Sequence, residues 1–154
     1  MAALVHGFDA APVAIGALLE RDLGALRYKQ PTRRAGRAVC NKAGFYVIRF
    51  STGSRCPGVL KIGRAIHGGG LLARLRDYRN KFGDHAQLLF ATTFARRCDR
   101  ANREQPVCAF EREVKRALRA RRVPVLRGAE YFSARSLSRM RRVIEQVAAG
   151  GGAA

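Results

Sequence analysis

The sequence predicts an α+β fold: a small three-stranded antiparallel sheet that is covered by helices and preceded by an N-terminal helix and a basic arm. Three observations support this prediction. Two short apolar segments, 44–50 and 59–63, are separated by a loop that contains glycine and proline, which is typical of a hairpin. A third apolar segment, 86–94, has the composition of a strand. The remaining apolar residues recur at helical spacing, so helices and strands are expected to share one domain.

Residues 1–43 are expected to form an extension before this domain. Apolar side chains at helical spacing predict an amphipathic helix over 12–27. The segment 28–43 is basic and contains proline and glycine, so we expect an extended arm there. The first residues do not resemble a secretory signal, because no basic start precedes them and Asp9 interrupts their apolar run.

The predicted hairpin begins the domain, which we place at 44–147. In residues 44–50 the side chains alternate between two faces, with Tyr46, Ile48 and Phe50 on one of them. The second strand, VLKIG, returns after the glycine- and proline-containing loop. The two strands should therefore pair in an antiparallel manner.

Helices and one further strand complete the predicted domain. A glycine-rich turn leads into a helix over 71–82, and the strand 86–94 follows it. Pro106 is suited to the first position of a helix over 107–122. A last helix is expected from Ser133, which is a suitable N-cap. The small residues at 148–154 offer nothing to pack, so this tail should be flexible.

The charge balance indicates a polyanionic partner. The chain has 30 Lys and Arg against 11 Asp and Glu, which gives a formal net charge of +19 over 154 residues. Such an excess repels itself in a compact fold, and nucleic acid is the favoured counterpart, with an anionic membrane surface as the alternative. No segment is long and apolar enough to span a bilayer, and the basic residues are scattered.

The cysteines and histidines argue against a structural zinc site. The four cysteines form no C-x-x-C pair, and the three histidines lie at no ligand spacing. Reduced thiols in an intracellular protein are the expectation.

Glu111 is the clearest local anomaly. Val107, Val114 and Leu118 form an apolar stripe on the helix 107–122, and Glu111 occupies the remaining position of that stripe. A carboxylate on an apolar face is costly unless it is paired or bound to a cation. It is either a metal ligand or a partner of one of the many basic groups. Glu113 points outward and is expected to be a surface charge.

Arg74 is the second candidate. It lies between Leu71 and Tyr78 at helical steps of three and four, along the edge of the buried stripe. A guanidinium at such a place suits a planar oxyanion, and the alternative is a structural pair with a carboxylate. Arg76 and Arg79 should face outward, toward phosphates.

Tyr46 and Lys61 are expected to be neighbours on one face of the hairpin. A lysine in a short apolar strand is costly to bury. A nearby positive charge favours the phenolate form of a tyrosine, so Lys61 should lower the pKa of Tyr46. The alternative is a buried tyrosine that is simply hydrogen-bonded.

In their order along the chain, these residues resemble the GIY-YIG nucleases. That family begins with a hairpin bearing G-[IVF]-Y and then [YK]-[IV]-G, which match GFY at 44–46 and KIG at 61–63. Arg74 and Glu111 match its helical arginine and glutamate, and EYF at 130–132 matches a late segment of a viral and phage branch. The resemblance covers 44–147.

The chain departs from the family pattern at several places. Phe45 replaces the usual aliphatic residue, and the glycines at 68–70 lengthen the approach to the arginine. Many members have a histidine near the catalytic helices, where this chain has Lys115, one turn after the glutamate. Some members also have an asparagine near the C-terminus, whereas no asparagine follows Asn102 in this chain.

The resemblance implies metal-dependent hydrolysis of nucleic-acid phosphodiester bonds. Glu111 would hold one divalent ion, Mg²⁺ or Mn²⁺. Tyr46 would take the proton from the attacking water, with Lys61 lowering its pKa or contacting the phosphate. Arg74 would stabilise charge on the phosphoryl oxygens, and Gly63 would let the substrate backbone approach closely.

Nucleic acid is the expected partner, with DNA favoured and RNA a second option. Four further basic residues are predicted to contact it: Arg64, Arg76, Arg79 and Lys115. A different function class also fits the charge, namely a non-catalytic scaffold that binds nucleic acid within a large assembly such as a ribosome or a virion. Such a component would also contact other proteins.

Overall fold

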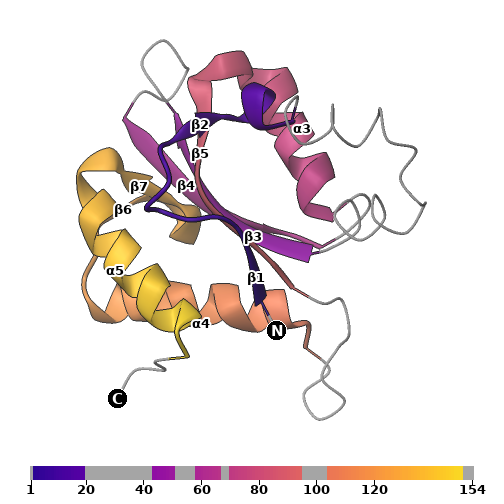
Figure 1. Ribbon diagram of the computed structural model, residues 1–154. Coiled ribbons are helices and arrows are strands. Elements are labelled where there is room, and N and C mark those ends of the chain that lie inside the picture. Colours follow the sequence, from indigo (N-terminus) through magenta and orange to yellow (C-terminus); the bar gives the residue numbers. More distant parts are fainter. Residues whose placement is uncertain (1, 20–42, 51–57, 67–69, 95–103, 151–154) are drawn as a thin grey trace.

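The computed structural model describes residues 2–19, 43–50, 58–66, 70–94 and 104–150 (Figure 1). The predicted basic arm lies outside the described residues except for Ala43, and so do the hairpin loop at 51–57 and the end of the tail.

A seven-stranded antiparallel sheet forms the centre of the molecule. Its strand order is β1-β5-β3-β4-β7-β6, and β2 also pairs with β5. The strands are β1 (Ala2–His6), β2 (Val13–Ala14), β3 (Ala43–Phe50), β4 (Val59–Ala65), β5 (Ala86–Phe94), β6 (Val125–Arg127) and β7 (Tyr131–Ser133).

The α+β class is confirmed, but the expected three-stranded sheet was too small. The predicted strands are β3, β4 and β5, which lie side by side with β3 in the middle. The sequence did not reveal β1, β2, β6 and β7, because each has five residues or fewer and shows no clear alternation. These short strands extend the sheet at both edges.

Three longer helices cover the sheet: α3 (Gly70–Phe82), α4 (Pro106–Ala120) and α5 (Leu137–Ala148). Pro106 begins α4 as predicted. The last helix starts later than expected, because Ser133 accepts a hydrogen bond from the Arg135 amide and caps a short 3₁₀ turn, η3 (Ala134–Ser136), that precedes α5. Another 3₁₀ turn, η1 (Gly83–His85), follows α3, and a third, η2 (Gly128–Glu130), precedes β7.

The N-terminal region differs from the predicted helix over 12–27. Val13 and Ala14 form β2, and helical backbone begins at Ile15 and continues to Leu19, where the described part ends. The side chains of Ile15, Leu18 and Leu19 are buried. The apolar spacing therefore located a helical turn that packs on the sheet, but not its first residue.

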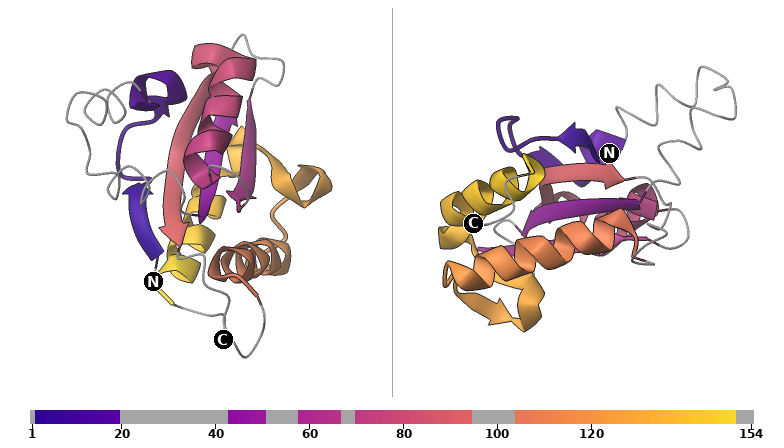
Figure 2. Two further views of the ribbon diagram at one scale, coloured as in Figure 1. Left: turned by 90° about the vertical axis from the view of Figure 1, so that its right-hand side faces the viewer. Right: turned by 90° about the horizontal axis from the view of Figure 1, so that it is seen from below.

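The helices lie on both sides of the sheet, with α3 on one side and α4 and α5 on the other (Figures 1 and 2). Alternation along β3 supplies both cores, since successive side chains point to opposite faces. Phe45 and Val47 pack with α4 and α5, whereas Tyr46 and Ile48 pack with α3. No helix within the described ranges is long and apolar enough to cross a membrane.

Candidate functional site

The pairing of β3 with β4 places Tyr46 and Lys61 on the same face of the sheet. Tyr46 lies opposite Gly63, and Lys61 lies opposite Ile48. Because side chains alternate in period two, Tyr46 and Lys61 are diagonal neighbours on the face that α3 covers. The structure thus brings these two predicted residues together.

Gly63 makes room for the ring of Tyr46. A Cβ atom at position 63 would lie 2.5 Å from the Tyr46 hydroxyl oxygen and 2.7 Å from its Cζ, which is closer than such atoms can approach. The expected role of Gly63 in substrate approach has no support in this arrangement. The glycine is required because the tyrosine side chain lies across it.

Tyr46 is almost fully buried, and its hydroxyl lies 3.2 Å from the hydroxyl of Tyr78, within hydrogen-bonding distance. Burial raises the pKa of Tyr46 well above its ordinary value, and the neighbouring Tyr78 raises it further. Arg74 acts in the opposite direction but is outweighed, and the charge of Glu130 adds a smaller increase. The prediction of a lowered pKa is therefore wrong, and Tyr46 is a poor proton acceptor in this arrangement.

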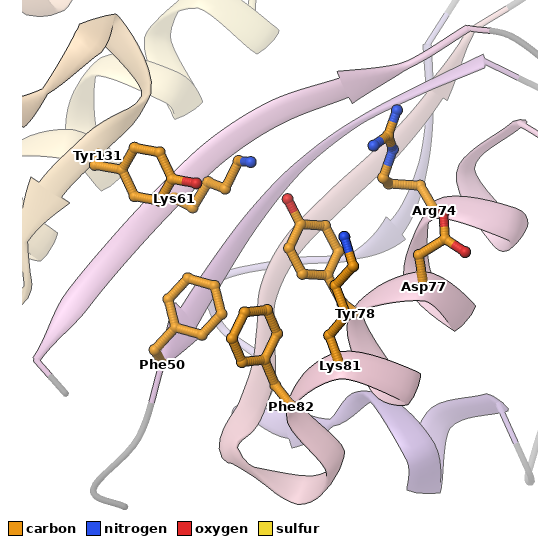
Figure 3. A pocket seen from close by; sticks show the side chains of 8 residues that line it. All are labelled: Phe50, Lys61, Arg74, Asp77, Tyr78, Lys81, Phe82 and Tyr131. Carbon is orange, nitrogen blue, oxygen red and sulfur yellow. The ribbon is translucent and has the colours of Figure 1, made fainter. Parts of the chain in front are cut away.

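Lys61 and Arg74 line one cleft, of about 160 Å³, between β4, β7 and α3 (Figure 3). Tyr78 and Tyr131 also line it, and the Lys61 Nζ lies 5.4 Å and 5.0 Å from the centroids of these two rings. We call this space the Lys61–Arg74 cleft. Its remaining lining residues are Phe50, Asp77, Lys81 and Phe82.

One face of α3 supplies most of the polar groups of the cleft. Arg74, Asp77, Tyr78 and Lys81 are spaced at i, i+3, i+4 and i+7, so they lie on the same side of the helix. Tyr131 comes from β7, which pairs with β4 so that Tyr131 lies opposite Lys61. The consecutive elements β4 and α3 therefore meet β7, which is distant from them in the sequence.

The cleft is positively charged. Partial burial lowers the pKa of Lys61, but its interactions with the Tyr78 and Tyr131 hydroxyls raise it by more, so the pKa lies above its ordinary value. Lys61 is therefore charged at neutral pH. Among the described residues, no salt bridge joins Lys61 or Arg74 to a carboxylate. Two unpaired cations that face one cleft are suited to an anion.

Glu111 lies on the other side of the sheet and does not join this cleft. Its side chain is 3% exposed, and its carboxylate is 2.7 Å from Arg64 Nη1 and 2.5 Å from Lys115 Nζ. Arg64 points to the α4 side because it follows Gly63 in the alternation of β4. The predicted convergence of Glu111 with Tyr46, Lys61 and Arg74 on one surface is therefore not found, because α4 packs on the opposite face from α3.

The surroundings of Glu111 do not fit a divalent metal ion as they stand. Each carboxylate oxygen already faces a cation, so Mg²⁺ or Mn²⁺ would approach against two positive charges. No group of three or more His, Cys, Asp or Glu side chains within the described part of the chain is placed to hold a metal. The salt-bridge alternative describes Glu111 in this structure.

The four predicted nucleic-acid contacts fall in different places. Arg64 and Lys115 hold Glu111, as described above. Arg76 and Arg79 lie about 200° and 140° around α3 from Arg74, away from the cleft. A Cβ at Gly16 would lie 3.6 Å from the Arg79 Cδ, so Arg79 runs alongside the N-terminal helical turn.

Sequence reasoning missed three residues of the site: Tyr78, Tyr131 and Glu130. Tyr78 has the spacing of a core residue, and it is indeed buried, but its hydroxyl reaches Tyr46. Glu130 lies 3.6 Å from Lys115 Nζ and its charge also acts on Tyr46. Glu130 therefore interacts with Lys115 on the α4 side of the sheet and with Tyr46 on the α3 side, and the EYF motif was its signal in the sequence.

Comparison with known proteins adds no relative: no family model matches the chain, and neither do curated proteins or solved structures.

Proposed function

We propose that this chain binds nucleic acid through backbone phosphates, and that the Lys61–Arg74 cleft holds one of them. The observation that carries this proposal is the pair of cations, one from β4 and one from α3, that face a common cleft without a carboxylate partner among the described residues. A net charge of +19 supplies the long-range attraction. The partly exposed ring of Tyr131, next to Lys61, offers an aromatic face on which a base can stack.

The resemblance to the GIY-YIG family supports the same assignment at the level of the scaffold. A hairpin, a helix, a strand and a second helix follow one another as β3, β4, α3, β5 and α4. We propose that β3, β4 and β5 with these helices form a GIY-YIG-like unit, onto which the outer strands are added. Binding without cleavage would suit a permanent component of a nucleic-acid-containing assembly.

The binding proposal is tested with the double variant Lys61→Gln/Arg74→Gln. Fluorescence anisotropy with short labelled DNA and RNA, single-stranded and duplex, should show a loss of affinity of about tenfold or more, because two phosphate contacts are removed. The matched control is Arg112→Gln/Arg116→Gln, which removes the same charge from arginines that are paired with Glu104 and Glu113. An equal loss in both double variants would contradict a role for the cleft.

A second candidate function is hydrolysis of the bound phosphodiester. It is favoured by one observation: the Tyr46 hydroxyl lies over Gly63 on the face that carries Lys61 and Arg74, so residues of both hairpin motifs meet. With its raised pKa, Tyr46 would keep its proton and act through the Tyr78 hydroxyl, which lines the cleft, and Arg74 would stabilise negative charge on the phosphate. The dependence on Mg²⁺ or Mn²⁺ that the resemblance implies belongs to this candidate.

Glu111→Gln separates the two functions. If Glu111 serves hydrolysis, nicking of plasmid DNA in Mg²⁺ or Mn²⁺ should fall by two or more orders of magnitude, equivalent to roughly 3 kcal/mol or more, whereas nucleic-acid binding should hold or tighten. If Glu111 only neutralises Arg64 and Lys115, no metal-dependent nicking exists to lose. The variant should then lose about 1–3 kcal/mol of folding stability. The loss is no larger because Arg64 and Lys115 are both partly exposed to solvent.

The control for this experiment is Glu113→Gln, two residues further along α4. Glu113 pairs only with Arg116 among the described residues, and both are partly exposed, so its removal should change stability by less than about 1 kcal/mol. Wild-type nicking that is abolished by EDTA and by Glu111→Gln, but not by Glu113→Gln, would establish the nuclease. A wild-type protein without nicking would exclude it.

A further inference from the structure

The arginines of α4 and α5 divide into a paired and an unpaired group. Arg112 and Arg116 form salt bridges with Glu104 and Glu113, and Arg141 with Glu145 and Asp9. By contrast, three arginines at the junction of the two helices have no salt bridge within the described residues: Arg121, Arg139 and Arg142. Intramolecular carboxylates thus pair with three arginines of these helices and leave the three at the junction, together with Arg119, without a carboxylate partner among the described residues.

The unpaired arginines surround a depression. Arg121, Arg139, Arg142 and Gln146 line a space of about 470 Å³ between the end of α4 and the outer face of α5. Arg139, Arg142 and Gln146 are spaced at i, i+3 and i+7, so they form one stripe that faces away from the buried Met140 side. The Arg121 guanidinium donates to the Gln146 side-chain oxygen, which orients it toward α5.

Capping of α4 accounts for only part of this arrangement. Arg139 donates a hydrogen bond of 3.5 Å to the Arg121 carbonyl oxygen, as a basic residue near a helix C-terminus often does. That contact uses one of the five donors of the Arg139 guanidinium. It explains neither Arg142 nor the absence of any lining carboxylate. Three guanidinium groups around one depression are suited to phosphate oxygens.

Helix α3, which lines the Lys61–Arg74 cleft, and helix α5, which lines the depression, lie on opposite sides of the sheet (Figures 1 and 2). A sheet with a helix layer on each side is about 30 Å thick. Duplex DNA is stiff over roughly 150 base pairs, so a duplex that is bound on one side does not bend round to the other at low cost. Two basic sites whose helices lie on opposite sides of the sheet are therefore available to two separate segments.

From these contacts we propose that the α4–α5 depression is a second phosphate-binding site, and that the protein bridges two nucleic-acid segments, one at each side of the sheet. The bridging part rests on the proposed nucleic-acid binding at the cleft. The second site itself does not, because its arginines are independent of that cleft.

A capture experiment tests bridging. A biotinylated duplex of about 40 base pairs on beads, far below the length over which DNA bends easily, is loaded with protein at low salt, washed, and offered a fluorescent duplex. Wild-type protein should capture the second duplex. Arg139→Gln/Arg142→Gln should load on the beads but capture at least fivefold less. Lys61→Gln/Arg74→Gln should show the same pattern, because one site remains in each variant.

The control Arg112→Gln/Arg116→Gln removes the same charge from the same side of the molecule and should capture as wild type does. Equal loss in this control would overturn the second site in favour of general charge. Wild-type capture by Arg139→Gln/Arg142→Gln would also overturn it, since bridging would then come from two protein copies joined to each other. Thermal melting of each variant checks that it is folded.

Two further outcomes distinguish this proposal from the previous one. Capture that is lost in Arg139→Gln/Arg142→Gln but unchanged in Lys61→Gln/Arg74→Gln would support the depression and contradict the cleft. Binding of polyglutamate to wild-type protein but not to Arg139→Gln/Arg142→Gln, with nucleic-acid capture unchanged, would assign the depression to an acidic protein and overturn the proposal.

Discussion

Gly63 and Tyr46 lie opposite each other in the β3–β4 pair, and their contact accounts for a glycine within a strand. Glycine in a strand interior normally weakens it, and here it provides the space that the tyrosine ring occupies. Tyr46 of the GFY motif and Gly63 of the KIG motif thus depend on each other for packing, without any ligand. This coupling leads to a prediction for each of the two residues.

Gly63→Ala should destabilise the protein by about 1–3 kcal/mol, because the added methyl group would overlap the Tyr46 ring and force a rearrangement. Tyr46→Leu removes the atoms in conflict. The double variant should therefore be more stable than the sum of the two single changes predicts, by about 0.5 kcal/mol or more. Urea unfolding of all four proteins measures this coupling, and strict additivity would contradict the contact.

Tyr46 should also affect stability at high pH. Its pKa is raised in the folded protein, so above about pH 10 the unfolded chain loses the proton while the folded protein keeps it. Stability is then lost as pH rises, by up to about 1.4 kcal/mol per pH unit for this group. Tyr46→Phe should flatten that dependence between pH 10 and 11 in urea unfolding. Parallel curves for both proteins would show that Tyr46 ionises freely.

At the scale of elements, β7 has a double role. Phe132 is buried opposite Leu60 and belongs to the core on the α4 side, whereas Tyr131 faces the Lys61–Arg74 cleft. A strand of three residues therefore closes the core with one side chain and completes the cleft with its neighbour. Alternation in period two makes this division possible.

Alanine substitution should mainly lower folding stability at Phe132 and mainly lower nucleic-acid affinity at Tyr131. Phe132→Ala should cost about 3–5 kcal/mol, because it leaves a cavity in the core. Tyr131→Ala should cost less than about 1.5 kcal/mol, since it removes a partly exposed ring and its interaction with Lys61. Thermal melts measure the two stabilities. Anisotropy titrations below the melting temperature of both variants should show a loss of nucleic-acid affinity only for Tyr131→Ala. A reversed order of stability would contradict the assigned faces of β7.

At the scale of the whole molecule, the excess of positive charge decides how binding responds to salt. Arginines and lysines reach both sides of the sheet, in the cleft and in the α4–α5 depression. Intramolecular carboxylates neutralise only some of them. The remaining cations release counterions from nucleic acid when they bind its phosphates.

The affinity for duplex DNA should therefore fall steeply with salt. Each phosphate contact contributes about −0.9 to the slope of log affinity against log salt concentration, and we expect the equivalent of at least roughly five contacts. Anisotropy titrations between about 50 and 200 mM salt measure the slope. A nearly flat dependence would contradict the polyanion partner for both candidate functions.

The sequence by itself determined the α+β class, the strands β3, β4 and β5, the helices α3 and α4, and the common face of Tyr46 and Lys61. These features follow from local periodicity and from the pairing of neighbouring strands, which a single chain displays directly. It also identified Glu111 as a buried carboxylate, although not its partners. Strands as short as β6 and β7 carry too few residues for a periodic signal.

Only the tertiary structure decided which side of the sheet each helix covers. Arg74 and Glu111 both lie on predicted helices, but α3 and α4 pack on opposite faces, so one residue meets Lys61 and the other meets Arg64. The pKa of Tyr46 was likewise decided by burial and by Tyr78, thirty-two positions away, rather than by its neighbour in the hairpin. Contacts between distant segments depend on how the layers pack, and a local pattern holds no information about that choice.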